Sequence, residues 1–297
     1  MRTPDPAEIG RVGDLGPADV LAALGAAGTG RTYDLDAGRF VGMPQWDGHP
    51  TFTLTPYRTP QGVRLAGDVE LFAPDHNAAG VGMVTELMVT GMHTGTHLDA
   101  LCHITDGDDT WFGGYSAADH CGDFGPVRAD AAAIPPIITR GVLLDAAGHL
   151  GEPFLPRGYG LGRDLLAEIA QAQGIEIPPK SCVLIRTGLM SVWPDPQRYA
   201  ATDGAGPDLD GARWLIDDKG CAVLGSDTST VEQIPSTDPA NPHPVHHFAL
   251  RRRGVHLLEN AFLEDLARDR VYEFLLICLP LKVAGATGSM VRPVAIA

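Results

Sequence analysis

The chain has 297 residues, 44% of them hydrophobic, which allows one large domain or two ordinary ones and a well-packed core. Its 37 acidic and 22 basic residues give a formal charge of -15, which argues against nucleic acid as a partner. The opening MRTPDPAEIG lacks the basic start and apolar core of a signal peptide, and no apolar run approaches the length of a membrane span, so we expect a cytoplasmic protein.

Predicted strands and helices alternate along the chain. Residues 1–45 contain one short helix around 17–24 and a glycine-rich stretch, so we expect an N-terminal extension wrapped on a catalytic domain of residues 46–297. A loosely alternating segment at 80–91 predicts a first strand. Beyond it, hydrophobic patterning predicts strands at 140–145, 181–187, 221–227, 255–260 and 271–281, and helices at 163–174, 244–253 and 261–270. This alternation, without tandem repeats or a long linker, predicts a single α/β domain.

The stretch HTGTHLDALCH, residues 93–103, gathers three histidines and an aspartate. On a straight strand His93 and Asp99 would lie roughly 20 Å apart, too far to share one ion. Gly95 offers a place to bend, so we expect a strand before it, a turn there, and a short helix from about Thr96. Such a bend would turn two imidazoles and one carboxylate inward, and these groups suit Zn²⁺ or Mn²⁺ with open positions left for water.

Other interpretations of these residues carry less weight. A lone histidine is more often a structural residue than a ligand, but three of the chain's 11 histidines fall in this one window. The nearby DGDDT, residues 106–110, lacks the full pattern of a calcium loop and is expected to be a solvated turn. The sequence contains no G-x-S-x-G motif, so serine-hydrolase chemistry is not indicated.

The motif H-x-G-T-H-x-D-x-P-x-H matches residues 93–103 at every polar position, with Leu101 where proline is usual. Together with the segments RGVLLD, VLIRTG and PLKVAGATGSMVRPVAIA, it makes the chain from about Pro50 onward similar to the cyclase family that includes bacterial kynurenine formamidase and isatin hydrolase. The resemblance implies a swivelling β/β/α fold with a mixed sheet and flanking helices, and a metal-dependent enzyme.

In the family, the first two histidines and the aspartate of this motif hold one metal ion. The same aspartate, with a histidine and a glutamate twelve residues apart, holds or approaches a second ion. Counting back from Glu259 gives His247, whereas His246 cannot share that helical face and is expected to be structural. His103 is the implied proton carrier. The ligands implied for one or two zinc or manganese ions are therefore His93, His97, Asp99, His247 and Glu259.

Substrate contacts are expected near the motif. Trp111 and Phe112 follow it closely and could stack on a planar substrate, although packing in the core or in a lid is an equal alternative. Ser226, in the stretch GSDTST, is expected to line the pocket or to cap a turn.

The resemblance implies an enzyme that hydrolyses a C–N bond in a small amide, formamide or cyclic imide by metal-activated water. An alternative is a metal-dependent cyclase or dehydratase acting on a polyketide-like intermediate, because the same metal ligands would serve both reactions. A third possibility, a metal-stabilised binding protein, does not require the spare proton carrier His103. The expected partners are a small-molecule substrate and further copies of the chain, as a homodimer or homotetramer, without a nucleic acid or a membrane.

Overall fold

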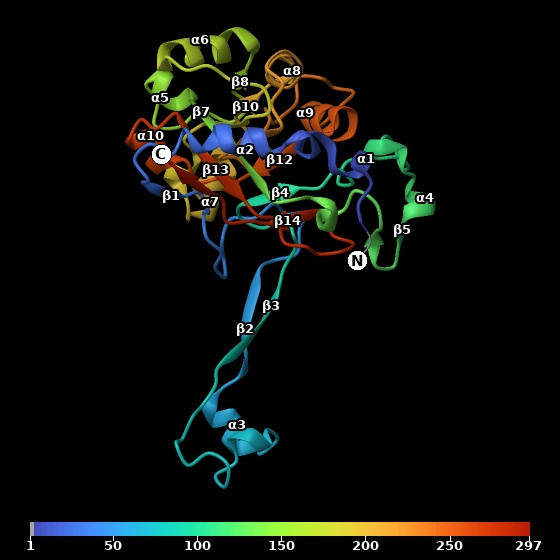
Figure 1. The fold of residues 1–297 in the computed structure, drawn as a ribbon, viewed down its shortest axis with the longest axis vertical. Coiled ribbons are helices and arrows are strands. Elements are labelled where there is room, and N and C mark those ends of the chain that lie inside the picture. Colours follow the sequence, from blue (N-terminus) through green and yellow to red (C-terminus); the bar gives the residue numbers. More distant parts are fainter. Residues whose placement is uncertain (1–2) are drawn as a thin grey trace.

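The structure, a computed structural model, describes residues 3–297. Its centre is a mixed β-sheet (Figure 1). The sheet has nine strands in the order β1-β15-β13-β7-β9-β11-β12-β4-β14. Its strands are β1 (Thr32–Asp34), β4 (His97–Asp99), β7 (Ile137–Asp145), β9 (Cys182–Arg186), β11 (Val223–Ser226), β12 (His256–Glu259), β13 (Glu273–Cys278), β14 (Gly288–Met290) and β15 (Val294–Ile296).

Four neighbouring strands, β7, β9, β11 and β12, run parallel at the centre of this sheet. Their residues are almost all buried on both faces, which is the pattern of parallel strands covered on both sides. Antiparallel pairs flank them, with β13 on β7 and β4 on β12. The five buried strands predicted after residue 140 are all present within a few residues of their predicted bounds.

Helices pack on the sheet and connect its strands. Helix α2 (Pro17–Leu24) contacts β7 and β13, and α6 (Arg163–Gln173) contacts β7 and ends at Gly174, which has the left-handed φ of 68° that a C-terminal glycine adopts readily. The predicted α/β class with a mixed sheet and flanking helices is therefore confirmed. Within residues 3–297, no helix combines the length and apolar character needed to cross a membrane.

The remaining elements are short. The other helices of the body are α1 (Pro6–Ile9), α4 (Ala117–His120), α5 (Ala146–Leu150), α7 (Pro196–Thr202), α8 (Leu209–Arg213), α9 (Pro244–His246) and α10 (Glu264–Arg268). The 3₁₀-helices of the body are η1 (Gly10–Asp14), η3 (Phe112–Gly114), η4 (Ala131–Ala133) and η5 (Leu189–Val192). The π-helices are η6 (Trp214–Asp218) and η7 (His247–Arg253). Two small ladders pair β5 (Cys121–Gly122) with β6 (Gly125–Pro126) and β8 (Gly160–Leu161) with β10 (Gly206–Pro207).

The described part of the predicted N-terminal extension lies against the body of its own chain. Strand β1 pairs with β15 at one edge of the main sheet, and Val12, Tyr33 and Leu35 are buried in the core. The boundary predicted at residue 45 falls where Pro44 and Gln45 already line a cavity. This segment therefore contributes to both the sheet and the surroundings of the cavity.

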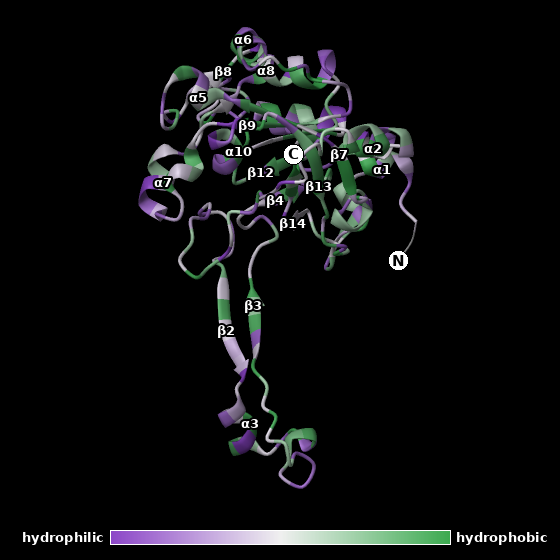
Figure 2. Cartoon of the chain, turned by 60° about the vertical axis from the view of Figure 1, so that its left-hand side comes forward, coloured by the Kyte–Doolittle hydropathy of each residue, from purple (hydrophilic) through white to green (hydrophobic). Residues whose placement is uncertain are grey.

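Residues 51–91 form an arm that projects from the body (Figure 1). Its stem is the antiparallel ribbon of β2 (Thr53–Arg58) and β3 (Thr85–Val89), and its tip carries α3 (Pro60–Ala66) and η2 (Glu70–Phe72). The strand predicted at 80–91 is thus present as β3, but in the arm. Figure 2 shows hydrophobic stretches along the arm. The exposed large apolar residues of the arm are Leu54, Tyr57, Leu65, Leu71, Val81, Val84, Leu87, Met88 and Val89.

The helix predicted from about Thr96 is wrong. Gly95, with a φ of 61°, makes the predicted bend, but the chain then enters the sheet as β4, between β12 and β14. Cross-strand hydrogen bonds to two neighbours satisfy the backbone of this short segment, and these long-range partners are invisible in the local pattern. Figure 2 shows β4 and β14 where the arm meets the body.

Candidate metal centre

Strand β4 and its partner β12 bring the carboxylates of the site together. His97 and Asp99 are two residues apart on β4 and therefore point to the same face of the sheet. The antiparallel register sets Glu259 of β12 directly opposite His97, and their side chains meet with His97 Nε2 3.1 Å from a Glu259 oxygen. His97 and Glu259, 162 positions apart in the sequence, are thus neighbours on one buried face.

Asp99 lies at the centre of the cluster. Its side chain is fully buried, with one carboxylate oxygen 2.8 Å from Nδ1 of His93 and 3.6 Å from Nε2 of His97. The other oxygen lies 3.8 Å from Nε2 of His246. Burial acts to raise the pKa of Asp99, but the nearby His103 and His93 outweigh it and hold this pKa below its usual range.

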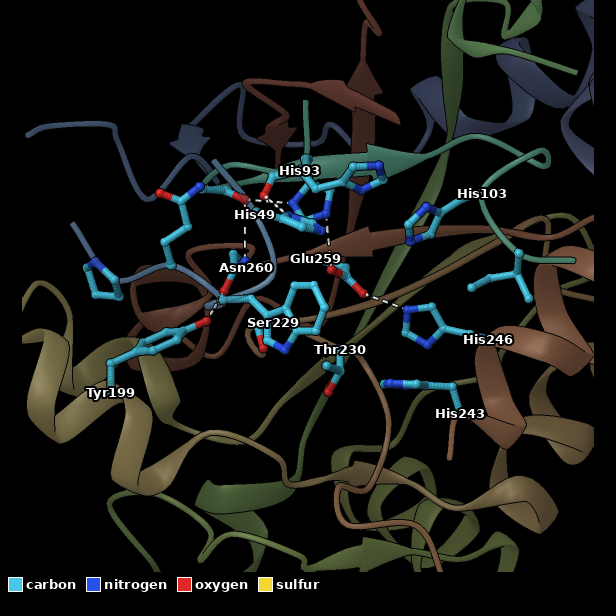
Figure 3. Close-up of a pocket in the computed structure, with 16 residues that line it drawn as sticks. His49, His93, His103, Tyr199, Ser229, Thr230, His243, His246, Glu259 and Asn260 are labelled. Carbon is cyan, nitrogen blue, oxygen red and sulfur yellow. Dashed lines mark hydrogen bonds and ion pairs between the residues drawn. The ribbon is translucent and has the colours of Figure 1, made fainter. Parts of the chain in front are cut away.

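The structure corrects one predicted ligand: His246, not His247, joins the cluster (Figure 3). Nε2 of His246 is 3.0 Å from a Glu259 oxygen, whereas Nε2 of His247 is 2.6 Å from Asp106, outside the cluster. The physical reason is that the helix widens into the π-helix η7 between the histidine and Gly254. A π-turn accommodates an extra residue, so counting back twelve residues from the glutamate reaches the neighbouring position.

His103 lies beside the same ligands. Its ring centroid is 4.2 Å from that of His93, and its ring offers a nitrogen within 4.8 Å of the ligand atoms of His93 and Asp99. Burial lowers the pKa of His103 to about 4, with Asp99 opposing that shift. The imidazole is therefore neutral near pH 7 and can accept a proton. The geometry also allows it to serve as a ligand, so its role as the proton carrier stays a prediction.

The side chains around Asp99 line a cavity of about 260 Å³, namely His93, His97, His103, His246 and Glu259. Trp46 and His49 line it from the segment that precedes the arm. Tyr199, of α7, and Asn260 also line it, and a hydrogen bond joins their side chains. None of these four residues was predicted from the sequence. The turn-rich stretch PQWDGHP carries an exposed tryptophan and a histidine, but only the fold shows that it borders the metal ligands.

The three predicted substrate contacts do not line this cavity, and that prediction is corrected. Trp111 is 2% exposed and belongs to the main core, while Phe112 packs against Gly254. Ser226 is fully buried and shares a 2.6 Å hydrogen bond with Thr228. Trp111 and Phe112 thus pack in or against the core, which was the alternative interpretation of these two residues.

The donor set fits a divalent metal ion. Within residues 3–297, two groups of side chains have ligand atoms that converge around Asp99: one adds His93 and His103, and the other adds His246 and Glu259. Both oxygens of Asp99 and Nε2 of His97 are buried without a well-aligned hydrogen bond among the described residues. Buried polar atoms normally have partners, and imidazole with carboxylate is a ligand set that suits zinc or manganese.

Buried imidazoles and carboxylates that converge beside a cavity are a set of side chains that can hold a metal ion. A family model described as "Putative cyclase" matches residues 33–233, more than half of the sequence, and the chain belongs to this cyclase family. A kynurenine formamidase of Bacillus cereus is 39% identical over 81 residues, which is 27% of this chain and 34% of the relative. The chain therefore matches only about a third of that relative's length.

Solved structures share the fold over nearly the whole chain. One described as a novel cyclase has a TM-score of 0.83 and 25% identity, covering 98% of this chain and 96% of its own. Isatin hydrolase A from Ralstonia solanacearum has a TM-score of 0.67 and 22% identity, covering 95% of this chain and 97% of its own. The resemblance inferred from the sequence is thereby confirmed at the level of family and fold.

Proposed function

We propose that this protein is a metal-dependent hydrolase that cleaves a C–N bond in a small amide, formamide or cyclic imide. The observation that carries the proposal is the buried Asp99, whose two oxygens face two groups of imidazole and carboxylate ligands that line a cavity. The names of similar proteins, a formamidase and an isatin hydrolase, support a carbon–nitrogen bond as the target.

The ligands proposed are His93, His97, Asp99, His246 and Glu259. A zinc or manganese ion held there would lower the pKa of a water molecule towards neutrality and polarise a carbonyl group. The neutral ring of His103 faces the same space and would take the proton from that water at one ring nitrogen. The same nitrogen would then return the proton to the leaving nitrogen of the substrate.

The cavity walls suit a small planar substrate. Trp46 and His49 form an edge-to-face pair with ring centroids 4.9 Å apart at the side next to the arm. The indole of Trp46 offers an apolar surface, while Asn260 and the hydroxyl of Tyr199 offer polar groups. A pocket of this size and mixed lining favours an amide attached to a small ring or chain.

Turnover should require a bound divalent metal ion. Protein stripped by a chelator should lose turnover on a panel of aryl formamides, cyclic imides and lactones, and Mn²⁺ or Zn²⁺ should restore it. Full turnover by protein shown to be metal-free by elemental analysis would contradict the proposal. Aldol-type cyclisation of a poly-β-keto mimic, with no hydrolysis of the panel, would instead favour the cyclase or dehydratase alternative.

We also propose that the protein works as a homodimer or homotetramer built through its arm. A two-stranded ribbon is marginally stable alone, and β2 and β3 expose apolar side chains along most of their length. The arm joins the body between His49 and His93, two residues that line the cavity. Docking of the arm on another copy of the chain would therefore also hold the cavity residues His49 and His93 in place.

A further inference from the structure

A second buried carboxylate, Glu232, lies behind His246. It belongs to the loop between β11 and α9, and its side chain is fully buried. One of its oxygens lies 2.5 Å from Nδ1 of His246, on the side of the ring opposite the metal cluster, and accepts a 3.3 Å hydrogen bond from the His246 backbone. The other oxygen accepts a 2.7 Å hydrogen bond from the backbone N–H of Val245.

These contacts make Glu232 the cap of the helix that carries His246. The residue at the usual capping position, His243, makes no side-chain capping bond, and Pro244 at the first helical position has no N–H. The two free amides of the first turn, those of Val245 and His246, point to Glu232 instead. A carboxylate favours such a position because the amino end of a helix is electropositive.

The same carboxylate therefore holds both the backbone and the ring of His246. Each oxygen of Glu232 accepts a hydrogen bond from a backbone N–H group, and such a group can only donate, so both oxygens act as acceptors. The oxygen that accepts the backbone N–H of His246 is also the one that lies 2.5 Å from Nδ1 of its ring, so Nδ1 is the donor in that contact. Nε2, the other ring nitrogen, faces Glu259 at 3.0 Å and Asp99 at 3.8 Å.

The backbone beside Glu232 is held in an unfavourable conformation. Val231, fully buried, has a φ of 57°, in the left-handed region that a β-branched residue rarely adopts. Such strain persists only where surrounding contacts impose it, and it concentrates at functional sites. The residue next to Val231 in the chain is Glu232, and its contacts with the helix and with the ring of His246 are the ones that this backbone conformation accompanies.

We propose that Glu232 is a positioning residue, which fixes the proton of His246 on Nδ1 and so directs the lone pair of Nε2 at the metal. This inference rests on the proposed metal role of His246. His243 contacts the same carboxylate at 3.2 Å and is half-exposed at the cavity wall, so it extends this hydrogen-bonded chain to the cavity. Partners of this kind, behind a metal-binding histidine, raise metal affinity and fix the ring.

Glu232→Gln should weaken metal binding. The amide presents one oxygen and one NH₂ group, whereas all four contacts of Glu232 come from nitrogen groups that donate to it. If the NH₂ group faces Nδ1 of His246, that nitrogen must accept, and the proton moves to Nε2, where it opposes a metal. We expect metal affinity, measured by competition with a chromogenic chelator, to fall about 10- to 100-fold. Glu232→Asp, which keeps the charge, should recover part of the loss.

Asp208→Asn is the matched control. Asp208 caps the neighbouring helix α8 through a 2.8 Å hydrogen bond from the Gly211 backbone, so this substitution makes the same change of carboxylate to amide at a nearby cap without touching His246. This variant should keep the metal affinity of the wild type. Wild-type affinity in Glu232→Gln, or an equal loss in Asp208→Asn, would overturn the positioning role while leaving metal-dependent hydrolysis intact.

A measurement on the unaltered protein gives an independent answer. In the zinc-loaded wild type, ¹⁵N chemical shifts of the His246 ring should show a protonated Nδ1 and a metal-bound Nε2. A metal-bound Nδ1 would overturn the proposal. This readout does not depend on turnover or on whether a variant folds.

Discussion

A comparison of His246, which lies in the metal-binding cluster, with His247, which does not, is the strongest test of the site. The two histidines are adjacent in sequence and alike in chemistry, but only the first reaches the buried cluster. His246→Ala should abolish tight binding of one metal ion, whereas His247→Ala should leave metal binding unchanged. Each variant is the matched control of the other, because both remove one imidazole from adjacent positions of the same helix.

The two substitutions should also differ in their effect on stability. His246→Ala removes contacts of 2.5 Å to Glu232 and 3.0 Å to Glu259, and so leaves two buried carboxylates without this partner. Breaking a buried charged pair from one side typically costs about 3 to 5 kcal/mol. His247→Ala removes a contact to a half-exposed Asp106 that keeps Arg251 at 2.7 Å and Arg252 at 2.9 Å, so the expected cost is at most about 1 kcal/mol.

The assay combines metal titration with denaturant unfolding of the metal-free proteins. The expected result is a loss of bound metal and a lower free energy of unfolding for His246→Ala alone. If His247→Ala lost its metal while His246→Ala kept it, the placement of the helix would be wrong. Equal metal loss in both variants would show that the helix as a whole, rather than one imidazole, supports the site.

Three further outcomes are expected. His103→Ala should keep its metal while kcat falls about 10²- to 10⁴-fold; metal loss in parallel would make His103 a ligand. Gly288→Ala should weaken metal binding, because its Cβ would lie 2.6 Å from the ring of His93, whereas Gly28→Ala, whose Cβ meets nothing within 4 Å, should not. Replacing residues 53–89 of the arm with a short Gly-Ser linker should dissociate the oligomer in sedimentation experiments and raise KM; unchanged sedimentation would rule out assembly through the arm.

The central strands and the metal motif could be predicted from the sequence because their signals are local. A parallel strand covered on both faces leaves a continuous apolar run, as in β7 and β9, and such runs stand out from the polar segments around them. The residues His93, Asp99 and His103 lie within eleven positions. The bend at Gly95 could be inferred as well, since an ion cannot reach ligands spread along a straight strand.

Contacts between distant segments could not be predicted in the same way. The strand at β4 depends on hydrogen bonds to β12 and β14, so the local pattern suggested a helix there. The position of His246 depends on a π-helix, whose extra residue has no composition signal of its own. Trp111 and Trp46 are equally aromatic, and only the packing of the whole chain buries the first and sets the second beside the cavity.

Whether the site holds one ion or two depends on Asp99. Its first oxygen lies 2.8 Å from His93 and its second faces His246 at 3.8 Å, so one carboxylate can serve both ligand groups. In two-metal sites the ions lie about 3.5 to 4 Å apart, a separation that one bridging carboxylate can span. Glu259→Gln removes a charged ligand and keeps the shape of the side chain, so it should weaken the site shared with His246 most.

We therefore expect close to two ions per wild-type chain by elemental analysis, and close to one in Glu259→Gln. Both proteins should unfold at similar denaturant concentrations when stripped of metal, because the glutamine amide can still hydrogen-bond to the neighbouring imidazoles. One ion per chain in both proteins would rule out the bridge. In that case His246 and Glu259 would act on the water or the substrate by hydrogen bonding, and their loss would reduce kcat with little change in metal content.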